Sequence, residues 1–213
     1  MIKGSEALSN CQHVLQQQST TFYENFLRAL LNVQLLKNST ITNQELTGLC
    51  DEYLEAAVDI FYYLIVMAEQ IAWKAMEVTH PNLTSHTLFS AISKHPNLEL
   101  FLDLLMRKCV SLWTQGDVKS SPDVTAAVVG SNSALTPSEC VRLYRSFVVL
   151  YRIITKIRTA KHRACSKYKE EFKYYIRPDS VTAKIPESYP ACAILRNVIR
   201  SVAVLVLPGQ NSR

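Results

Sequence analysis

The chain has 213 residues, of which 48% are apolar, so it can build one large core or two small ones, and disorder over most of its length is disfavoured. It contains only five Gly and eight Pro, fewer than strands with tight hairpin turns normally need, and this composition favours helices. The net charge is +5, but residues 1–140 carry eight Lys or Arg against fourteen Asp or Glu, a net of −6, whereas residues 141–213 carry fifteen against four, a net of +11.

Helical periodicity runs through the acidic part of the chain. Apolar residues at steps of three, four or seven predict a first helix over residues 5–38. Thr42 and Glu45 have the spacing of a capping box, so a second helix is expected over residues 43–78, and the middle of this helix is apolar all round. Its expected apolar stripe comprises Leu46, Leu49, Cys50, Tyr53, Ala57, Ile60, Leu64, Met67, Ala68 and Ile71.

Two copies of His-Pro-Asn-Leu, at residues 80–83 and 95–98, mark the next boundaries. Proline disfavours helical geometry in the residue before it and fits the first turn of a new helix. We therefore expect a short helix over residues 85–94 and a longer one over residues 97–115. Residues 116–135 are rich in small and polar side chains without a sustained period, which predicts a loop or linker.

The clearest helix start is the sequence Thr-Pro-Ser-Glu at residues 136–139, with a capping Thr, Pro at the first helical position and Glu at the third. The periodicity then predicts one uninterrupted helix to residue 175, about 39 residues or ~58 Å long. Residues 191–208 fit a buried final helix or, because several are β-branched, equally a strand. The apolar seam of the long helix is expected to comprise Leu143, Phe147, Leu150, Ile154, Ile157, Ala164, Tyr168, Phe172 and Tyr175.

A basic face lies opposite this seam on the helical wheel. Like charges four residues apart cost a few tenths of a kcal/mol per pair, which a partner of opposite sign would recover. Such a partner is the phosphates of RNA or DNA, acidic lipid headgroups, or an acidic protein surface, which includes Glu52, Glu55 and Asp59 of this chain or of another copy. Lipid binding is disfavoured because the fold needs the whole apolar seam, and a merely solvated face is the plain alternative. The seven candidate contacts, within an arc of about 100°, are Arg142, Arg145, Arg152, Lys156, Arg163, Lys167 and Arg177.

Signatures of enzymes and metal sites are missing from the sequence. There is no Gly-rich phosphate loop, G-x-S-x-G or H-E-x-x-H motif, and the six cysteines show no zinc spacing, so no catalysis, cofactor or metal is expected. The apolar run at residues 60–68 is far shorter than the ~20 residues that span a bilayer, so no transmembrane segment is expected. No secretory signal is visible, which favours a reducing compartment with free thiols.

Together these patterns predict an all-α fold, a bundle of five to seven helices with one long basic amphipathic helix in the C-terminal third. Residues 1–115 would form an acidic helical body, residues 116–135 a linker, and residues 136–213 the basic helix and a C-terminal helix packed on the body as one domain. The expected function is a non-enzymatic scaffold or adaptor, cytoplasmic or nuclear, that binds an acidic protein partner through the basic face. The alternative is non-sequence-specific nucleic-acid binding by the same face, and the length of the seam leaves homo-oligomerisation open.

Overall fold

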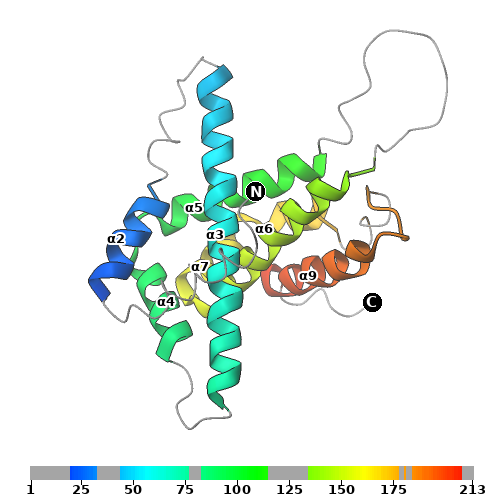
Figure 1. Ribbon diagram of the computed structural model, residues 1–213. Coiled ribbons are helices and arrows are strands. Elements are labelled where there is room, and N and C mark those ends of the chain that lie inside the picture. The colour runs from blue at the N-terminus through cyan, green and yellow to red at the C-terminus, as the bar shows by residue number, and fades with distance from the viewer. Residues whose placement is uncertain are drawn as a thin grey trace, which may run out of the picture. The chain divides into compact units, whose positions relative to one another are not determined.

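Helices and their connections make up the part of the chain that the computed structural model describes, namely residues 20–32, 44–76, 83–114, 134–177, 180 and 184–207 (Figure 1). No strand occurs in these ranges, so the predicted all-α class is confirmed for them. The chain divides into two compact units, residues 1–103 (unit 1) and residues 104–213 (unit 2). The principal helices are α2 (Thr20–Leu30), α3 (Gln44–Met76), α4 (Leu83–Lys94), α5 (Leu98–Thr114), α6 (Pro137–Lys156), α7 (Arg158–Lys167), the π-helical turn η3 (Glu171–Tyr175) and α9 (Pro190–Val206).

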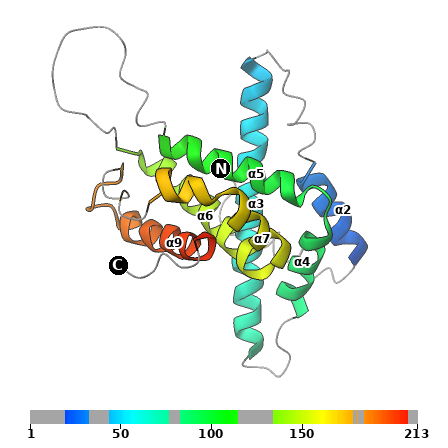
Figure 2. The ribbon, with the colours of Figure 1, turned by 180° about the vertical axis from the view of Figure 1, so that it is seen from behind.

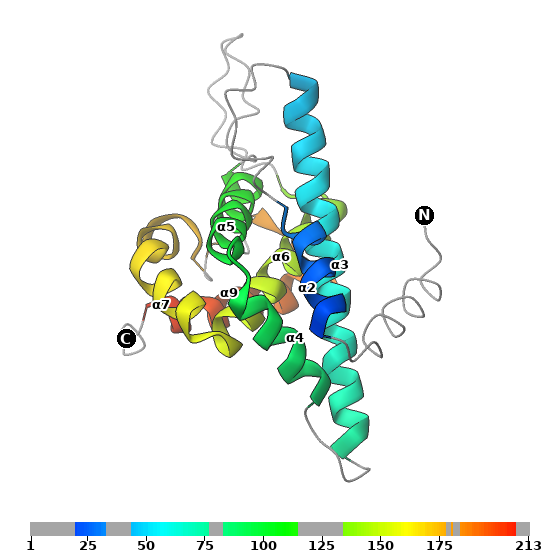
Figure 3. The same ribbon diagram turned by 90° about the vertical axis from the view of Figure 1, so that its left-hand side faces the viewer.

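Unit 1 contains α2, α3, α4 and the first residues of α5. Helix α4 packs against both α2 and α3, and Figure 3 shows α2 and α4 lying along α3. The rings of Phe61 on α3 and Phe101 on α5 meet with their centres 5.1 Å apart, and both side chains are fully buried. These aromatic rings therefore form the centre of the first core, together with the buried Leu27 and Leu88.

The buried face of α3 differs from the predicted stripe. Leu49 and Ile60 belong to that stripe but are 60% and 39% exposed. Because the middle of α3 is apolar all round, its periodicity does not determine which side the neighbouring helices cover. The predicted capping box at residues 42–45 begins outside the described residues. Among the described side chains of α3, the buried apolar ones are Leu54, Ala57, Val58, Phe61, Leu64, Ile65, Met67 and Ala68.

Unit 2 is built on the packing of α6 along α9, with α7 against both (Figure 2). The final segment, for which helix and strand were equally expected, is the helix α9. Its buried residues recur at steps of three or four, the period of one helical face, which explains why helix prevails over the β-branched residues. A backbone hydrogen bond from Leu135 N to Lys184 O, 2.8 Å long, ties the start of α6 to the segment before α9.

The prediction of one uninterrupted helix from residue 137 to residue 175 is wrong. Ile157 has extended geometry, with φ −118° and ψ 113°, and separates α6 from α7. A second break follows at Tyr168. The rings of Phe147 and Phe172 lie 6.3 Å apart, although an unbroken helix would place them about 37 Å apart along its axis. The chain therefore folds back, because this lets η3 bury Phe172 against α6.

The apolar seam is nevertheless buried almost as predicted. Its members from Leu143 to Phe172 are at most 4% exposed, whereas Tyr175 is 56% exposed and Ile176 is fully buried. The reason lies in η3, where Ile176 N donates to Glu171 O, 2.8 Å away and five residues earlier. This wider turn brings Ile176 to the core in place of Tyr175.

The predicted linker and domain boundaries remain predictions. Residues 115–133 lie outside the described residues, so the linker expected at 116–135 is described only at its last two positions. The boundary between the compact units falls within α5, which crosses it without a break. The division into an acidic body at 1–115 and a basic part at 136–213 remains a prediction.

Candidate functional site

Charge is divided sharply between the two units. Unit 1 carries 5 Lys or Arg against 11 Asp or Glu, a net of −6, whereas unit 2 carries 18 against 7, a net of +11. The charge asymmetry of the sequence therefore coincides with a division of the structure. Unit 2 therefore carries the positive charge that an anionic partner would require.

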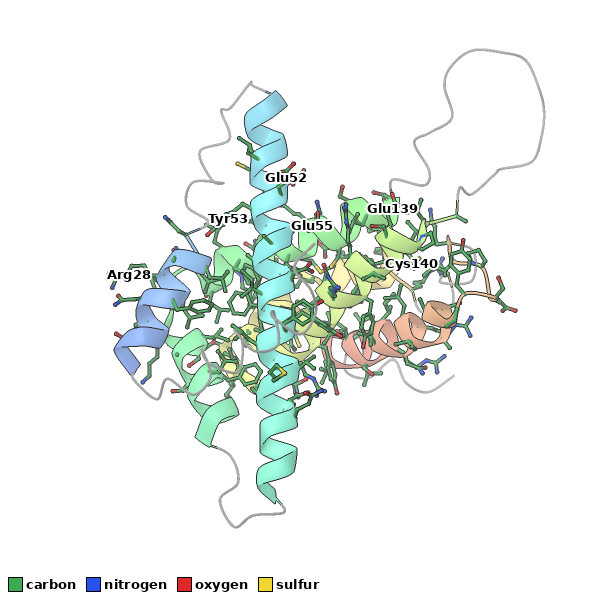
Figure 4. All side chains as sticks on the ribbon, viewed as in Figure 1. Arg28, Glu52, Tyr53, Glu55, Glu139 and Cys140 are labelled. Carbon is green, nitrogen blue, oxygen red and sulfur yellow. The ribbon has the colours of Figure 1, made fainter. Side chains whose placement is uncertain are left out.

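The basic helices of unit 2 begin at a confirmed capping box. Glu139 N donates to Thr136 Oγ1 at 3.3 Å, and Thr136 N donates to Glu139 Oε2 at 2.8 Å. Pro137 occupies the first turn, where its missing N–H costs nothing. Figure 4 shows Glu139 and Cys140 in this first turn. The box determines where α6 starts and hence the direction in which each following side chain points.

The seven predicted contact residues all lie outside the core. Four are on α6, two on α7 and one after η3, so the break at Ile157 divides them between separate helices. The Arg152 guanidinium lies 5.4 Å from the centre of the Tyr151 ring, a cation–π contact that holds this side chain along α6. Arg142, Lys156, Lys167 and Arg177 are exposed, and Arg145, Arg152 and Arg163 are half-buried.

Helix α7 carries exposed cations beyond the seven predicted contact residues. The helical wheel of an unbroken helix placed these cations outside the basic face. The ten residues of α7 carry four Lys or Arg and no acid, and the side chains that this helix buries are Ala160 and Ala164. Arg158 and Lys161 are exposed here, as are Lys169 and Lys173 just after the helix. The wheel of an unbroken helix could not place these residues, because their directions depend on the break at Ile157. A simple count of charges in this ten-residue window would have found them.

Two exposed tyrosines lie close to these cations along the chain. Tyr174 and Tyr175 in η3 are 58% and 56% exposed. The Lys173 ammonium lies 4.8 Å from the centre of the Tyr174 ring. Its interactions with Tyr174, and to a lesser degree the charge of Glu170, raise the pKa of Lys173, which favours its charged form. The surface thus offers aromatic faces as well as positive charge.

The cysteines of the described part are free and mostly shielded. Burial raises the pKa of Cys109 to about 12, so this thiol has almost no thiolate at neutral pH. Burial, the Glu139 carboxylate and the nearby Cys192 also raise the pKa of Cys140. In the described ranges no group of three His, Cys, Asp or Glu side chains could hold a metal ion. These thiols therefore act as small apolar packing groups.

The helices also bear on the relation of the chain to a membrane. None of those within the described residues has both the length and the apolar character needed to cross a bilayer.

Comparison with known proteins identifies a family but no activity. An uncharacterized protein C12orf56 homolog from Macaca fascicularis is 27% identical over 116 residues, which cover 49% of this chain and 19% of the relative. The matched part thus spans about a fifth of the length of that curated relative. No solved structure is significantly similar to the chain. Residues 1–204 match one family along nearly the whole chain, and the protein belongs to that family, which is described as "Protein of unknown function (DUF4551)".

Proposed function

We propose that the protein is a non-enzymatic scaffold or adaptor that binds an acidic protein surface through unit 2. The basic surface that would make the contact consists of the seven predicted residues together with Arg158, Lys161, Lys169 and Lys173. The observation that carries the proposal is the one-sided charge of α7, which has four Lys or Arg and no acid and turns two alanines inward. A short polar helix of this kind gains stability when an anionic partner offsets the repulsion between its charges.

The exposed tyrosines support a specific protein contact. Tyrosine and arginine are enriched among the residues that contribute most to protein interfaces, because they combine a large packing surface with a polar end. Tyr174 and Tyr175 lie within a few residues of Lys169, Lys173 and Arg177 along the chain. An acidic partner would therefore meet both charge and aromatic packing area at this end of the surface.

Binding of single-stranded nucleic acid is the second candidate function, and the same tyrosines favour it. Proteins that bind single strands without sequence preference combine a basic groove with aromatic rings on which bases stack. In such a complex Tyr174 and Tyr175 would stack on bases while Lys173 and Arg177 contact phosphates.

The decisive experiment measures binding of the full chain to poly-L-glutamate, to single-stranded RNA and to duplex DNA across a salt series. The test variant is Lys156→Glu with Lys167→Glu, because both side chains are exposed. The matched control is Arg107→Glu with Arg200→Glu, which changes the net charge equally at exposed positions elsewhere in unit 2. We expect poly-L-glutamate binding that falls with salt, weakens by about tenfold or more in the test variant, and is nearly unchanged in the control.

Other results would contradict the proposal. If both variants weaken binding equally, the interaction follows net charge and not the basic surface. If nothing binds at low salt, the surface is merely solvated. If RNA binds more tightly than poly-L-glutamate and Tyr174→Ala with Tyr175→Ala removes that preference, the nucleic-acid function replaces the adaptor function.

A further inference from the structure

Unit 1 contains a pocket of about 390 Å³, between α2, α4 and the connection from α4 to α5. This volume falls in the range of about 300–1,000 Å³ that is typical of small-molecule sites. Ala91 and Pro96 form the accessible apolar wall of the pocket, and Leu27, which also borders it, is fully buried. The pocket belongs to the acidic unit and has no residue in common with the basic surface of unit 2.

The charged side chains of the pocket are mostly cationic, although unit 1 as a whole is acidic. Arg28 from α2 and Lys94 from the last turn of α4 line it, opposed by one carboxylate, Glu24. Glu24 and Arg28 are four residues apart on α2, yet no ion pair joins them, and within the described residues no ion pair engages Lys94. Figure 4 shows Arg28 on the side of α2 away from α3. Both cations are therefore left to interact with a bound anion.

His95 supplies a third donor whose orientation is set by its neighbours. Asn97 N donates to His95 Nδ1 at 3.2 Å, so Nδ1 is the acceptor and Nε2 carries the hydrogen. Asn97 is itself anchored, because its Nδ2 donates to Leu31 O at 2.9 Å. Partial burial and the charge of Arg28 lower the pKa of His95, so the neutral form with Nε2–H prevails at neutral pH. The loop that carries the imidazole is thus held in place before any ligand arrives.

We propose that this pocket binds a small organic oxyanion, either a phosphate monoester or a carboxylate. Its anionic group lies among Arg28, Lys94 and His95, which offer a guanidinium, an ammonium and an imidazole N–H. Two fixed charges and one neutral donor suit a group with several acceptor oxygens. Its organic part packs against the apolar wall, because a bare inorganic anion would leave most of the pocket unfilled.

The test follows the histidine imidazoles of the full chain by nitrogen NMR after labelling with ¹⁵N-histidine. The chain has five histidines, and the His95 signals are assigned by their loss in His95→Gln. The protein is titrated separately with phenyl phosphate, benzoate and inorganic phosphate. We expect phenyl phosphate or benzoate to saturate the His95 shift and to raise the pKa of His95, because a bound anion stabilises the imidazolium. Whichever of the two binds more tightly assigns the class of anion.

Substitutions of the charged pocket residues test whether each charge strengthens or weakens binding of the anion. Arg28→Gln and Lys94→Gln should each weaken binding by about tenfold, whereas Glu24→Gln should tighten it, because it removes the one repulsive carboxylate. Arg107→Gln, at an exposed arginine outside the pocket, should leave the affinity unchanged. Circular dichroism verifies that each variant is folded.

Three results would overturn the proposal. The first is the absence of saturable binding by either organic anion. The second is an affinity that Arg28→Gln and Lys94→Gln leave unchanged or that Glu24→Gln lowers. The third is inorganic phosphate binding as tightly as phenyl phosphate, since the apolar wall would then contribute nothing. None of these results depends on the basic surface of unit 2.

Discussion

The hydroxyl of Tyr53 shows how single side chains hold unit 1 together. It reaches from α3 to the end of α2 and donates to Ala29 O at 2.6 Å and to Leu30 O at 3.1 Å, as Figure 4 allows the reader to follow. The next carbonyl, that of Leu31, accepts from Asn97. The last carbonyls of a helix have no partner within the helix, so α2 depends on its neighbours for its C-terminal cap.

Removal of this hydroxyl should weaken unit 1 measurably. Tyr53→Phe should lower the free energy of unfolding by about 1 kcal/mol, because the carbonyls of Ala29 and Leu30 lose the one hydroxyl donor that they share, in an exposed and a half-buried hydrogen bond. The measurement is urea unfolding followed by circular dichroism. Tyr175→Phe is the matched control, since this exposed tyrosine should change stability by much less.

The difference in stability between the wild type and Tyr53→Phe should also depend on pH. Burial raises the pKa of Tyr53 above its ordinary value of about 10, and the backbone of Asn32 opposes this weakly. A raised pKa stabilises the protonated folded form, so the contribution is complete below pH ~10 and is lost as the pH rises through the folded pKa. The stability difference between wild type and Tyr53→Phe should therefore shrink above pH ~10. A difference that grows there would contradict this assignment.

The burial of some residues could be predicted from the sequence, whereas that of others could not. The burial of Phe147, Ala164 and Phe172 follows from local periodicity and is confirmed. The exposure of Ile60 and Tyr175 could not be predicted, because it depends on which face a neighbour covers and on a π turn whose stabilising contact is distant in sequence. The pocket around His95 was missed because its donors come from segments that are far apart along the chain.

In helices α6 and α7, the local sequence determines one helix boundary and tertiary packing determines another. The start of α6 is set by four consecutive residues and was predicted correctly. Its end at Ile157 has no local signal, because Ile157 is neither Gly nor Pro. The break is explained by the return of the chain over α6, which places Phe172 beside Phe147. Helix propensity is a weak preference that such packing overrides.

The capping box gives a prediction at the level of the helix. Thr136→Ala should destabilise the protein by about 1 kcal/mol, because Glu139 N loses its acceptor and the carboxylate loses a hydroxyl donor. Thr155→Ala is the control at the other end of α6, where the hydroxyl only bonds back to Tyr151 O within the helix. Alanine is the better helix former there, so Thr155→Ala should be neutral or slightly stabilising. Equal losses in the two variants, measured by urea unfolding, would argue against a special role for the cap.

Across the whole molecule, the two compact units differ in charge and in the kind of site they carry. Unit 1 has a net charge of −6 and holds the pocket, and unit 2 has a net charge of +11 and carries the basic surface. Helix α5 belongs to both units, so the division passes through continuous backbone. Whether the units open separately is therefore a question of energetics that the two substitutions above can answer.

Hydrogen exchange followed by mass spectrometry should separate the units. Tyr53→Phe should speed exchange in α2 and α3 and leave α9 nearly unchanged, whereas Thr136→Ala should speed exchange in α6 and α9 and leave α2 unchanged. Each variant is the control for the other. If both variants speed exchange everywhere to the same degree, the molecule opens as one cooperative body and the division is only geometric.

The π turn at Glu171–Tyr175 also bears on how members of this family can be aligned. Such a turn is equivalent to an α-helix that has gained one residue. A family member that lacks one residue at this position would have ordinary α-helical spacing here. Buried apolar residues of that protein could still occupy the places of Phe172 and Ile176. A single-position gap here between family members would accordingly mark a change in what the surface displays, with the core retained.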